Sequence, residues 1–149
     1  MGRWLMAVSF IILAVSGLNV LYGKSVLLPL IGPEAFASVT QLGKFVHNYV
    51  SFAFALGIAL MFVTWVKDNF PTVLDLRWFL QGGGLIGSNH PPADRFNGGQ
   101  KVLFWATVLG GIALSVSGYI MMFRPVDVAI SGFQLATVVH GLTGLVLVA

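Results

Sequence analysis

Four long stretches of the chain contain no Asp, Glu, Lys or Arg, and they limit its possible folds more than any other feature. The stretches are Trp4–Gly23, Phe45–Val66, Val102–Phe123 and Val128–Ala149, and each has at least 20 residues. An α-helix rises about 1.5 Å per residue, so about 20 residues cross a hydrocarbon core of about 30 Å. Because the apolar residues are continuous rather than alternating, helices are favoured over barrel strands. The sequence therefore predicts an all-α fold, a four-helix transmembrane bundle.

The composition excludes several other classes of protein. Hydrophobic residues make up 57% of the 149 residues and charged residues only 9%, whereas about a quarter of the residues in a soluble domain are charged. Disordered chains are also rich in charge and poor in apolar residues. The Lys and Arg residues form no cluster of the kind that binds nucleic acid. The absence of Cys rules out disulfides, iron–sulfur clusters and covalently attached c-type haem.

We interpret residues 1–149 as a single transmembrane domain. Its helices are predicted at about 4–23, 42–66, 101–123 and 131–149, with a polar loop at 67–100. Between the first two helices, Pro29, Gly32 and Pro33 are expected to prevent a regular helix over Lys24–Lys44. Within the polar loop, one short amphipathic helix is expected near Val73–Leu80.

The basic residues indicate how the chain is oriented in a membrane. Five belong to the start of the first helix and the polar loop (Arg3, Lys67, Arg77, Arg95 and Lys101), and three to the opposite side (Lys24, Lys44 and Arg124). Since cytoplasmic loops carry an excess of Lys and Arg, we expect both termini and the loop 67–100 in the cytoplasm. An alternative for the first apolar stretch is a signal peptide, but its length and the lack of a cleavage site after it favour a membrane helix.

Both ends of the sequence are typical of a fragment. The fourth apolar stretch runs to Ala149 with no basic residue or aromatic belt to end it, and the first begins three residues after Met1. We therefore expect a chain truncated at both ends. The alternative is a chain that simply ends at the membrane surface.

Two of the three His residues lie inside apolar stretches, where ionisable groups are costly and are functional by default. His47 follows Gln41, at the start of the second helix, by six residues, and His140 follows Gly132, at the start of the fourth, by eight. At about 1.5 Å per residue, both are roughly 9–12 Å from the same membrane face. Two imidazoles at one depth on two helices suit a haem iron bound between them. The alternative for each His is a packing role, with a hydrogen bond to a neighbouring helix.

Four residues around these histidines also suit a haem but have a second interpretation. Gly17 and Gly118 end the near-repeats Ala-Val-Ser-Gly and Ser-Val-Ser-Gly, and such small residues allow a flat ring or another helix to approach the backbone. Lys44 is one helical turn from His47, and Arg124 belongs to the same membrane face. Each is suited to a haem propionate or to extending to the membrane surface as a boundary residue.

The end of the polar loop is the second candidate site. The stretch Asp94–Lys101 supplies amides, a carboxylate and two cations at the start of the third helix. Within it, Asn97, Gln100 and Lys101 suit the carbonyl oxygens of a quinone. The alternative is an ordinary helix start with Asn97 as its cap. His90 is expected to be a solvated loop residue. The sequence holds no nucleophile–base arrangement and no carboxylate pair within a predicted helix, so we expect no catalytic residues in this chain.

Several motifs together resemble the cytochrome b (gamma) subunit of respiratory membrane-bound formate dehydrogenases, over nearly the whole chain. The motifs are Trp4–Phe10, Ala14–Gly17, Gly43–His47, Phe96–Lys101 leading into Phe104-Trp105, Ser117-Gly118, Phe123–Pro125 and His140. The Asn-x-Gly-Gln-Lys element at residues 97–101 is the most specific, whereas the His positions are shared with relatives such as hydrogenase cytochrome b subunits.

The resemblance implies a di-haem cytochrome b bundle in the bacterial inner membrane. It implies electrons that come from an iron–sulfur beta subunit, itself joined to a molybdenum or tungsten catalytic alpha subunit, and leave to quinone. His47 and His140 match the two axial iron ligands of the haem b on the periplasmic side. Asn97 and Gln100 match the loop beside the quinone pocket. The chain is thus expected to relay electrons without oxidising formate itself.

The sequence departs from the family's pattern in two places. The family has a His before the first Trp, where this chain has Arg3, and its fourth ligand His lies beyond the position of Ala149. We therefore expect one haem b in this chain, against two in the family. Two alternative functions stay open: the cytochrome b subunit of another respiratory dehydrogenase, of hydrogenase or thiosulfate reductase type, and a haem-free membrane anchor.

Overall fold

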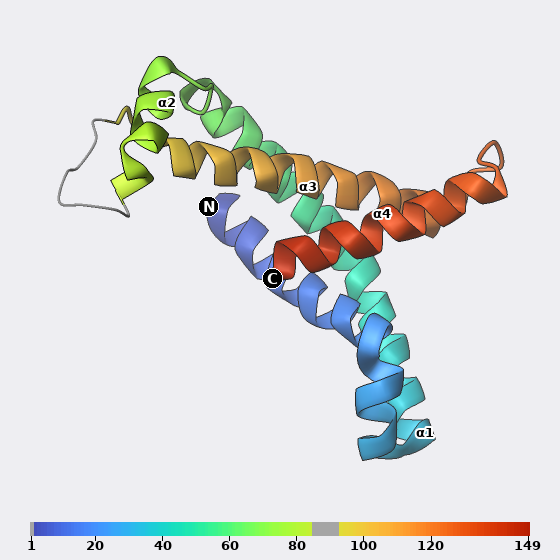
Figure 1. Cartoon of the computed structure of the whole chain (residues 1–149). Coiled ribbons are helices and arrows are strands. Elements are labelled where there is room, and N and C mark those ends of the chain that lie inside the picture. The colour runs from blue at the N-terminus through green and yellow to red at the C-terminus, as the bar shows by residue number, and fades with distance from the viewer. Residues whose placement is uncertain (1, 85–92) are drawn as a thin grey trace.

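The chain folds into helices joined by turns, and no strand occurs among the residues described (Figure 1). The computed structural model describes residues 2–84 and 93–149. The helices are α1 (Gly2–Trp65), α2 (Val73–Leu80), α3 (Gly98–Phe123) and α4 (Ile130–Val148), with 3-10 turns at Val66–Asp68 and Gly82–Gly84. This architecture confirms the predicted all-α fold class, and the short helix α2 occupies the predicted residues.

Helix α1 is a hairpin of two helical legs that reverses at Gly32 (Figure 1). Gly32 has φ 77° and ψ 168°, a conformation open to glycine and hardly to other residues. Pro33 follows directly and begins the second leg, where its missing N–H is not needed. The legs are in close contact, since a Cβ added at Gly57 would lie 2.9 Å from Cα of Met6. The expectation of an irregular Lys24–Lys44 segment is therefore wrong: the interruption is confined to Gly32.

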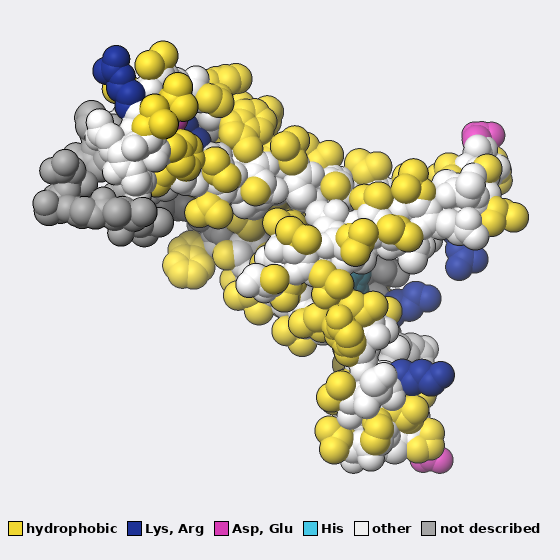
Figure 2. All heavy atoms as spheres, in the orientation of Figure 1, with side chains coloured by type: hydrophobic (Ala, Val, Ile, Leu, Met, Phe, Trp, Pro, Cys, Tyr) yellow, Lys and Arg dark blue, Asp and Glu magenta, His cyan; other side chains and the backbone are white. Residues whose placement is uncertain are grey.

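Within residues 2–84 and 93–149, three helices are long and apolar enough to cross a membrane: the Trp4–Asp68 segment, α3 and α4. Helices of this kind are those of a multi-pass membrane protein. The first of them folds back at Gly32 into two legs, and the division into four crossings stays a prediction. Most large apolar side chains are exposed on these helices, as Figure 2 shows. Such exposure is expected where lipid rather than water surrounds the helices.

The buried core joins the second leg of α1 to α3. It consists of Phe54, Ile58 and Met61 from α1 with Phe104 and Val108 from α3. Helix α4 packs along α3, while the tip of the α1 hairpin diverges from the turn between α3 and α4 (Figure 1). The two hairpins therefore cross near their middles and separate towards one end.

Candidate functional site

His47 on the second leg of α1 and His140 on α4 lie close together, edge to face, between the two hairpins. Their ring centroids are 6.1 Å apart, with 63° between the ring planes. A metal–imidazole bond is about 2 Å, so two rings on opposite sides of one metal ion have centroids roughly 6 Å apart. The spacing of the two rings therefore fits a bis-imidazole iron. Among the described residues, no group of three or more His, Cys, Asp or Glu is placed to hold a metal.

Each imidazole packs against a Ser-Gly pair on the neighbouring helical segment. Oγ of Ser16 lies 2.8 Å from Nδ1 of His47, and Oγ of Ser117 lies 3.1 Å from Nδ1 of His140. A Cβ added at Gly17 would lie 3.5 Å from Cε1 of His47, and a Cβ added at Gly118 would lie 3.0 Å from Cε1 of His140. The two glycines thus make room for the histidines themselves.

The partners of Nδ1 bear on which ring nitrogen carries the proton. The carbonyl oxygen of Leu114, which only accepts, lies 3.0 Å from Nδ1 of His140, so this ring carries its proton on Nδ1. Oγ of Ser16 lies 2.8 Å from the carbonyl oxygen of Ile12, and with its one hydrogen in that bond it accepts from Nδ1–H of His47. This tautomer leaves on Nε2 the lone pair with which imidazole binds a metal.

Lys44 and Arg124 are both exposed, and neither has an ion-pair partner within residues 2–84 and 93–149. Arg124 ends α3 in a left-handed conformation, with φ 46° and ψ 63°. It lines a cavity of about 410 Å³ with Phe133 and Thr137, and Thr137 lies one turn before His140. Figure 2 shows Lys and Arg side chains around the opening between α1 and the α3–α4 pair, with a His side chain inside it. The opening thus has cations at its rim.

Asn97 and Gln100 form a capping box at the start of α3. Oδ1 of Asn97 accepts from the backbone N–H of Gln100 at 2.9 Å, and Oε1 of Gln100 accepts from the backbone N–H of Asn97 at 3.0 Å. Asn97 therefore caps the helix, as in the alternative given above. This cap explains why α3 begins at Gly98 rather than near residue 101. The cap uses only the amide oxygens, so the N–H donors of the two side-chain NH₂ groups take no part in it.

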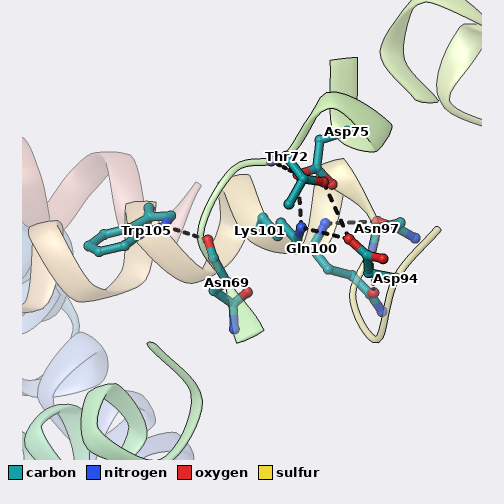
Figure 3. A network of polar contacts seen from close by, with 8 residues as sticks. All are labelled: Asn69, Thr72, Asp75, Asp94, Asn97, Gln100, Lys101 and Trp105. Carbon is teal, nitrogen blue, oxygen red and sulfur yellow. Dashed lines mark hydrogen bonds and ion pairs between the residues drawn. The ribbon is translucent and has the colours of Figure 1, made fainter. Parts of the chain in front are cut away.

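Lys101 is buried in a polar network between α2 and α3 (Figure 3). Its side chain is 4% exposed, and Nζ donates to Oδ2 of Asp75 at 2.8 Å and lies 3.7 Å from Oδ2 of Asp94. The backbone N–H of Thr72 donates to Oδ2 of Asp75 at 2.7 Å. Two carboxylates therefore surround the charge of Lys101, and its predicted place in a quinone site stays a prediction.

The environment of Asp75 shifts the pKa of its carboxyl group. Burial raises this pKa, but the hydrogen bonds from Lys101 and Thr72 outweigh burial, so the pKa lies below its ordinary value. Asp75 also lines a cavity of about 340 Å³ with Phe79, Lys101 and Trp105. The network thus holds a charged pair against an apolar cavity.

Three residues at these two sites were missed by the sequence analysis: Ser16, Ser117 and Asp75. The near-repeat of Ser before Gly was a usable signal for the serines. Asp75 gave no signal, because only the packing of α2 against α3 brings it to Lys101. His90 lies outside the described residues.

Comparison with known proteins identifies the family. The chain matches the family described as prokaryotic cytochrome b561 over residues 4–149. It is 26% identical over 152 residues to the nitrate-inducible formate dehydrogenase cytochrome b556(Fdn) subunit of Escherichia coli K12, covering 98% of this chain and 67% of that protein. It is 29% identical over 127 residues to the formate dehydrogenase cytochrome b556(fdo) subunit of the same strain, covering 83% and 56%. A formate dehydrogenase cytochrome b556 subunit of Haemophilus influenzae is 30% identical over 87 residues, covering 54% and 35%. The sequence resemblance is thereby confirmed, and the chain belongs to the prokaryotic cytochrome b561 family.

Proposed function

We propose that this chain is the membrane cytochrome b subunit of a respiratory formate dehydrogenase, which relays electrons through b-type haem to quinone. Membership of the cytochrome b561 family implies a b-type haem. The observation that supports its place is the 6.1 Å spacing of the His47 and His140 rings, each with Nδ1 hydrogen-bonded and Nε2 left for iron.

His47 and His140 would hold the haem iron through Nε2. When bound, the haem would supply reversible one-electron chemistry. The contribution of the chain is to place one imidazole on each hairpin, fix its tautomer and surround it with apolar helices that exclude water. Gly17 and Gly118 give the rings room, and Lys44 and Arg124 supply cations suited to propionates.

The names of the relatives support a partner within a formate dehydrogenase complex, and the family resemblance implies which subunits are the proposed partners. They are an iron–sulfur beta subunit on the periplasmic side and, through it, a molybdenum or tungsten alpha subunit that oxidises formate. The chain would lie in the bacterial inner membrane with loop 67–100 in the cytoplasm, as its basic residues favour. With His47 and His140 as the only axial pair proposed for this chain, it would hold one haem b.

Quinone would be reduced at the end of the bundle that carries loop 67–100. The NH₂ groups of Asn97 and Gln100 would donate hydrogen bonds to a quinone carbonyl while their oxygens cap α3. The Lys101 network and the apolar cavity beside Trp105 support this location, because a quinone needs polar groups next to an apolar space. Reduction takes two electrons from the complex and two protons from the cytoplasm.

A reduced-minus-oxidised optical spectrum of the purified chain tests the haem site. We expect b-type absorbance of a low-spin iron, lost in His47→Ala and in His140→Ala and retained in His90→Ala. A wild-type chain without this absorbance after haem supplementation would leave a haem-free membrane anchor as the function. An unchanged spectrum in the His47 variant would remove that residue from the ligand set.

Co-purification distinguishes the partner dehydrogenases. A tagged chain expressed in its native host should bring down an iron–sulfur subunit and formate-oxidising activity. Recovery of hydrogenase or thiosulfate reductase activity instead would favour the cytochrome b subunit of one of those enzymes.

A further inference from the structure

Two buried serines contact the two imidazole rings, one serine in each helical hairpin. Ser16 is 8% exposed and Ser117 is 4% exposed. Each precedes the glycine that faces the ring, within the repeats Leu-Ala-Val-Ser-Gly and Leu-Ser-Val-Ser-Gly. In each hairpin the first helical segment carries the serine and the second carries the histidine. The same device therefore occurs twice.

We infer that Ser16 and Ser117 are positioning residues that fix both imidazoles in the Nδ1–H form and strengthen Nε2 as an iron ligand. This inference rests on the proposed function, because it concerns the ligands of the proposed haem. The supporting geometry is the contact of each Oγ with Nδ1, at 2.8 Å for His47 and 3.1 Å for His140.

A purely structural role does not account for these contacts. Ser9 lies on the same leg of α1, is 3% exposed, and donates its hydroxyl hydrogen to the carbonyl oxygen of Leu5 at 2.6 Å. Ser16 makes the equivalent bond to Ile12. The difference is that Oγ of Ser16 also accepts from an imidazole. Hydrogen bonding within the helix is thus common to both serines, and the contact with Nδ1 is what Ser16 and Ser117 add.

The electronic consequence follows from the direction of the hydrogen bond. An imidazole that donates from Nδ1–H becomes a more basic ligand at Nε2. A more basic ligand stabilises the oxidised iron, which carries more positive charge, over the reduced iron. The two serines should therefore lower the reduction potential of a haem bound between His47 and His140.

A redox titration of the purified holoprotein, followed by the haem absorbance, tests this inference. The variants are Ser16→Ala, Ser117→Ala, the conservative Ser16→Thr and Ser117→Thr, and the matched control Ser9→Ala. We expect Ser16→Ala to shift the reduction equilibrium towards the reduced form by about tenfold, which is about 59 mV for a one-electron couple. Ser117→Ala should shift it in the same direction by less, because the carbonyl oxygen of Leu114 still accepts from Nδ1 of His140 at 3.0 Å. The Thr variants keep the hydroxyl and should stay near the wild-type potential, as should Ser9→Ala.

The outcomes separate this inference from the proposed function. A wild-type protein that binds no haem would refute the proposed function. Haem-loaded Ala variants with the wild-type potential would refute the inference alone. Loss of haem in the Ala variants, with retention in the Thr variants, would support positioning by the hydroxyl group. Loss in both the Ala and the Thr variants would assign the serines to packing and overturn the inference.

Discussion

Nζ of Lys101 lies 2.8 Å from Oδ2 of Asp75, and this buried ion pair joins the start of α3 to α2 (Figure 3). The two side chains are 4% and 10% exposed. The chain also offers a natural control, since Arg95 and Asp68 pair at the same 2.8 Å distance with the Arg95 side chain 63% exposed. Removing one partner of a buried ion pair lowers the stability of a protein far more than removing one partner of an exposed pair.

Lys101→Met should destabilise the protein by about 3–5 kcal/mol, because it leaves the Asp75 carboxylate buried and without its partner. The control Asp68→Asn breaks the exposed pair and should cost less than about 1 kcal/mol. The free energy of unfolding in detergent, from denaturant titration, measures both. Equal losses in the two variants would show that the Lys101 pair is no more important than a surface contact.

The stability should fall in acid because of Asp75. The pKa of its carboxyl group in the folded chain lies below the ordinary value of 3.8, so unfolding lets it take up a proton more readily. Its contribution is fully present above the ordinary pKa and is lost as the pH falls through the lower folded pKa. Unfolding free energies from neutral pH to about pH 2 should show this decline, and Asp75→Asn should show less of it. An identical pH profile in Asp75→Asn would contradict the prediction.

Asn97 offers a way to separate capping from quinone binding. Asn97→Ala removes the cap and the NH₂ group and should cost about 1 kcal/mol of stability. Asn97→Asp keeps an oxygen for the cap but loses the amide donor, so we expect near wild-type stability with slower quinone reduction. Thermal unfolding and a quinone-reductase assay of the assembled complex measure the two effects. Wild-type quinone reduction by Asn97→Asp would limit the residue to capping.

Gly118→Ala should disturb the His140 ring more than Gly17→Ala disturbs His47. A Cβ at position 118 would lie 3.0 Å from Cε1 and 3.3 Å from Nδ1, whereas one at position 17 would lie 3.5 Å and 4.0 Å from those atoms. The haem absorbance and haem content of the two purified variants make the comparison. A Gly118→Ala protein with the haem content and spectrum of Gly17→Ala would refute this difference.

Gly32→Ala should destabilise the α1 hairpin by about 1–3 kcal/mol. The cost comes from the backbone conformation, because nothing lies within 4 Å of the added Cβ. Gly141→Ala is the matched control: it also meets nothing within 4 Å, but it has a helical backbone and should not lose stability. Comparable destabilisation of the two variants would mean that the conformation of Gly32 is not what matters.

The helices were predictable because charges and apolar stretches are local features of the sequence. The spacing of charges predicted four crossings, and residues 73–80 formed the short helix that was expected. The hairpin reversal was harder to predict, since Pro33 is disruptive inside a helix but tolerated at the start of one. Whether Gly32 alone ends a helix depends on how the two legs pack, which local sequence does not determine.

The candidate site was predictable only in part, for a similar reason. Depth in the membrane predicted that His47 and His140 share a level, and the structure places their rings 6.1 Å apart. The roles of Gly17 and Gly118 depend on the side chain that each one faces, and that side chain comes from a distant part of the sequence. The ion pair of Lys101 with Asp75 was not predictable, because Asp75 lies 26 residues away and reaches Lys101 only through the fold.

One histidine comes from each helical hairpin, and this division has a consequence for assembly. The two hairpins separate beyond their crossing, and His47 and His140 are close only when both are in place. Any metal held by both imidazoles adds its binding free energy to the association of the two halves of the chain. Cofactor binding and membrane assembly would then be thermodynamically linked. A shortage of haem would weaken the packing of the two hairpins against each other.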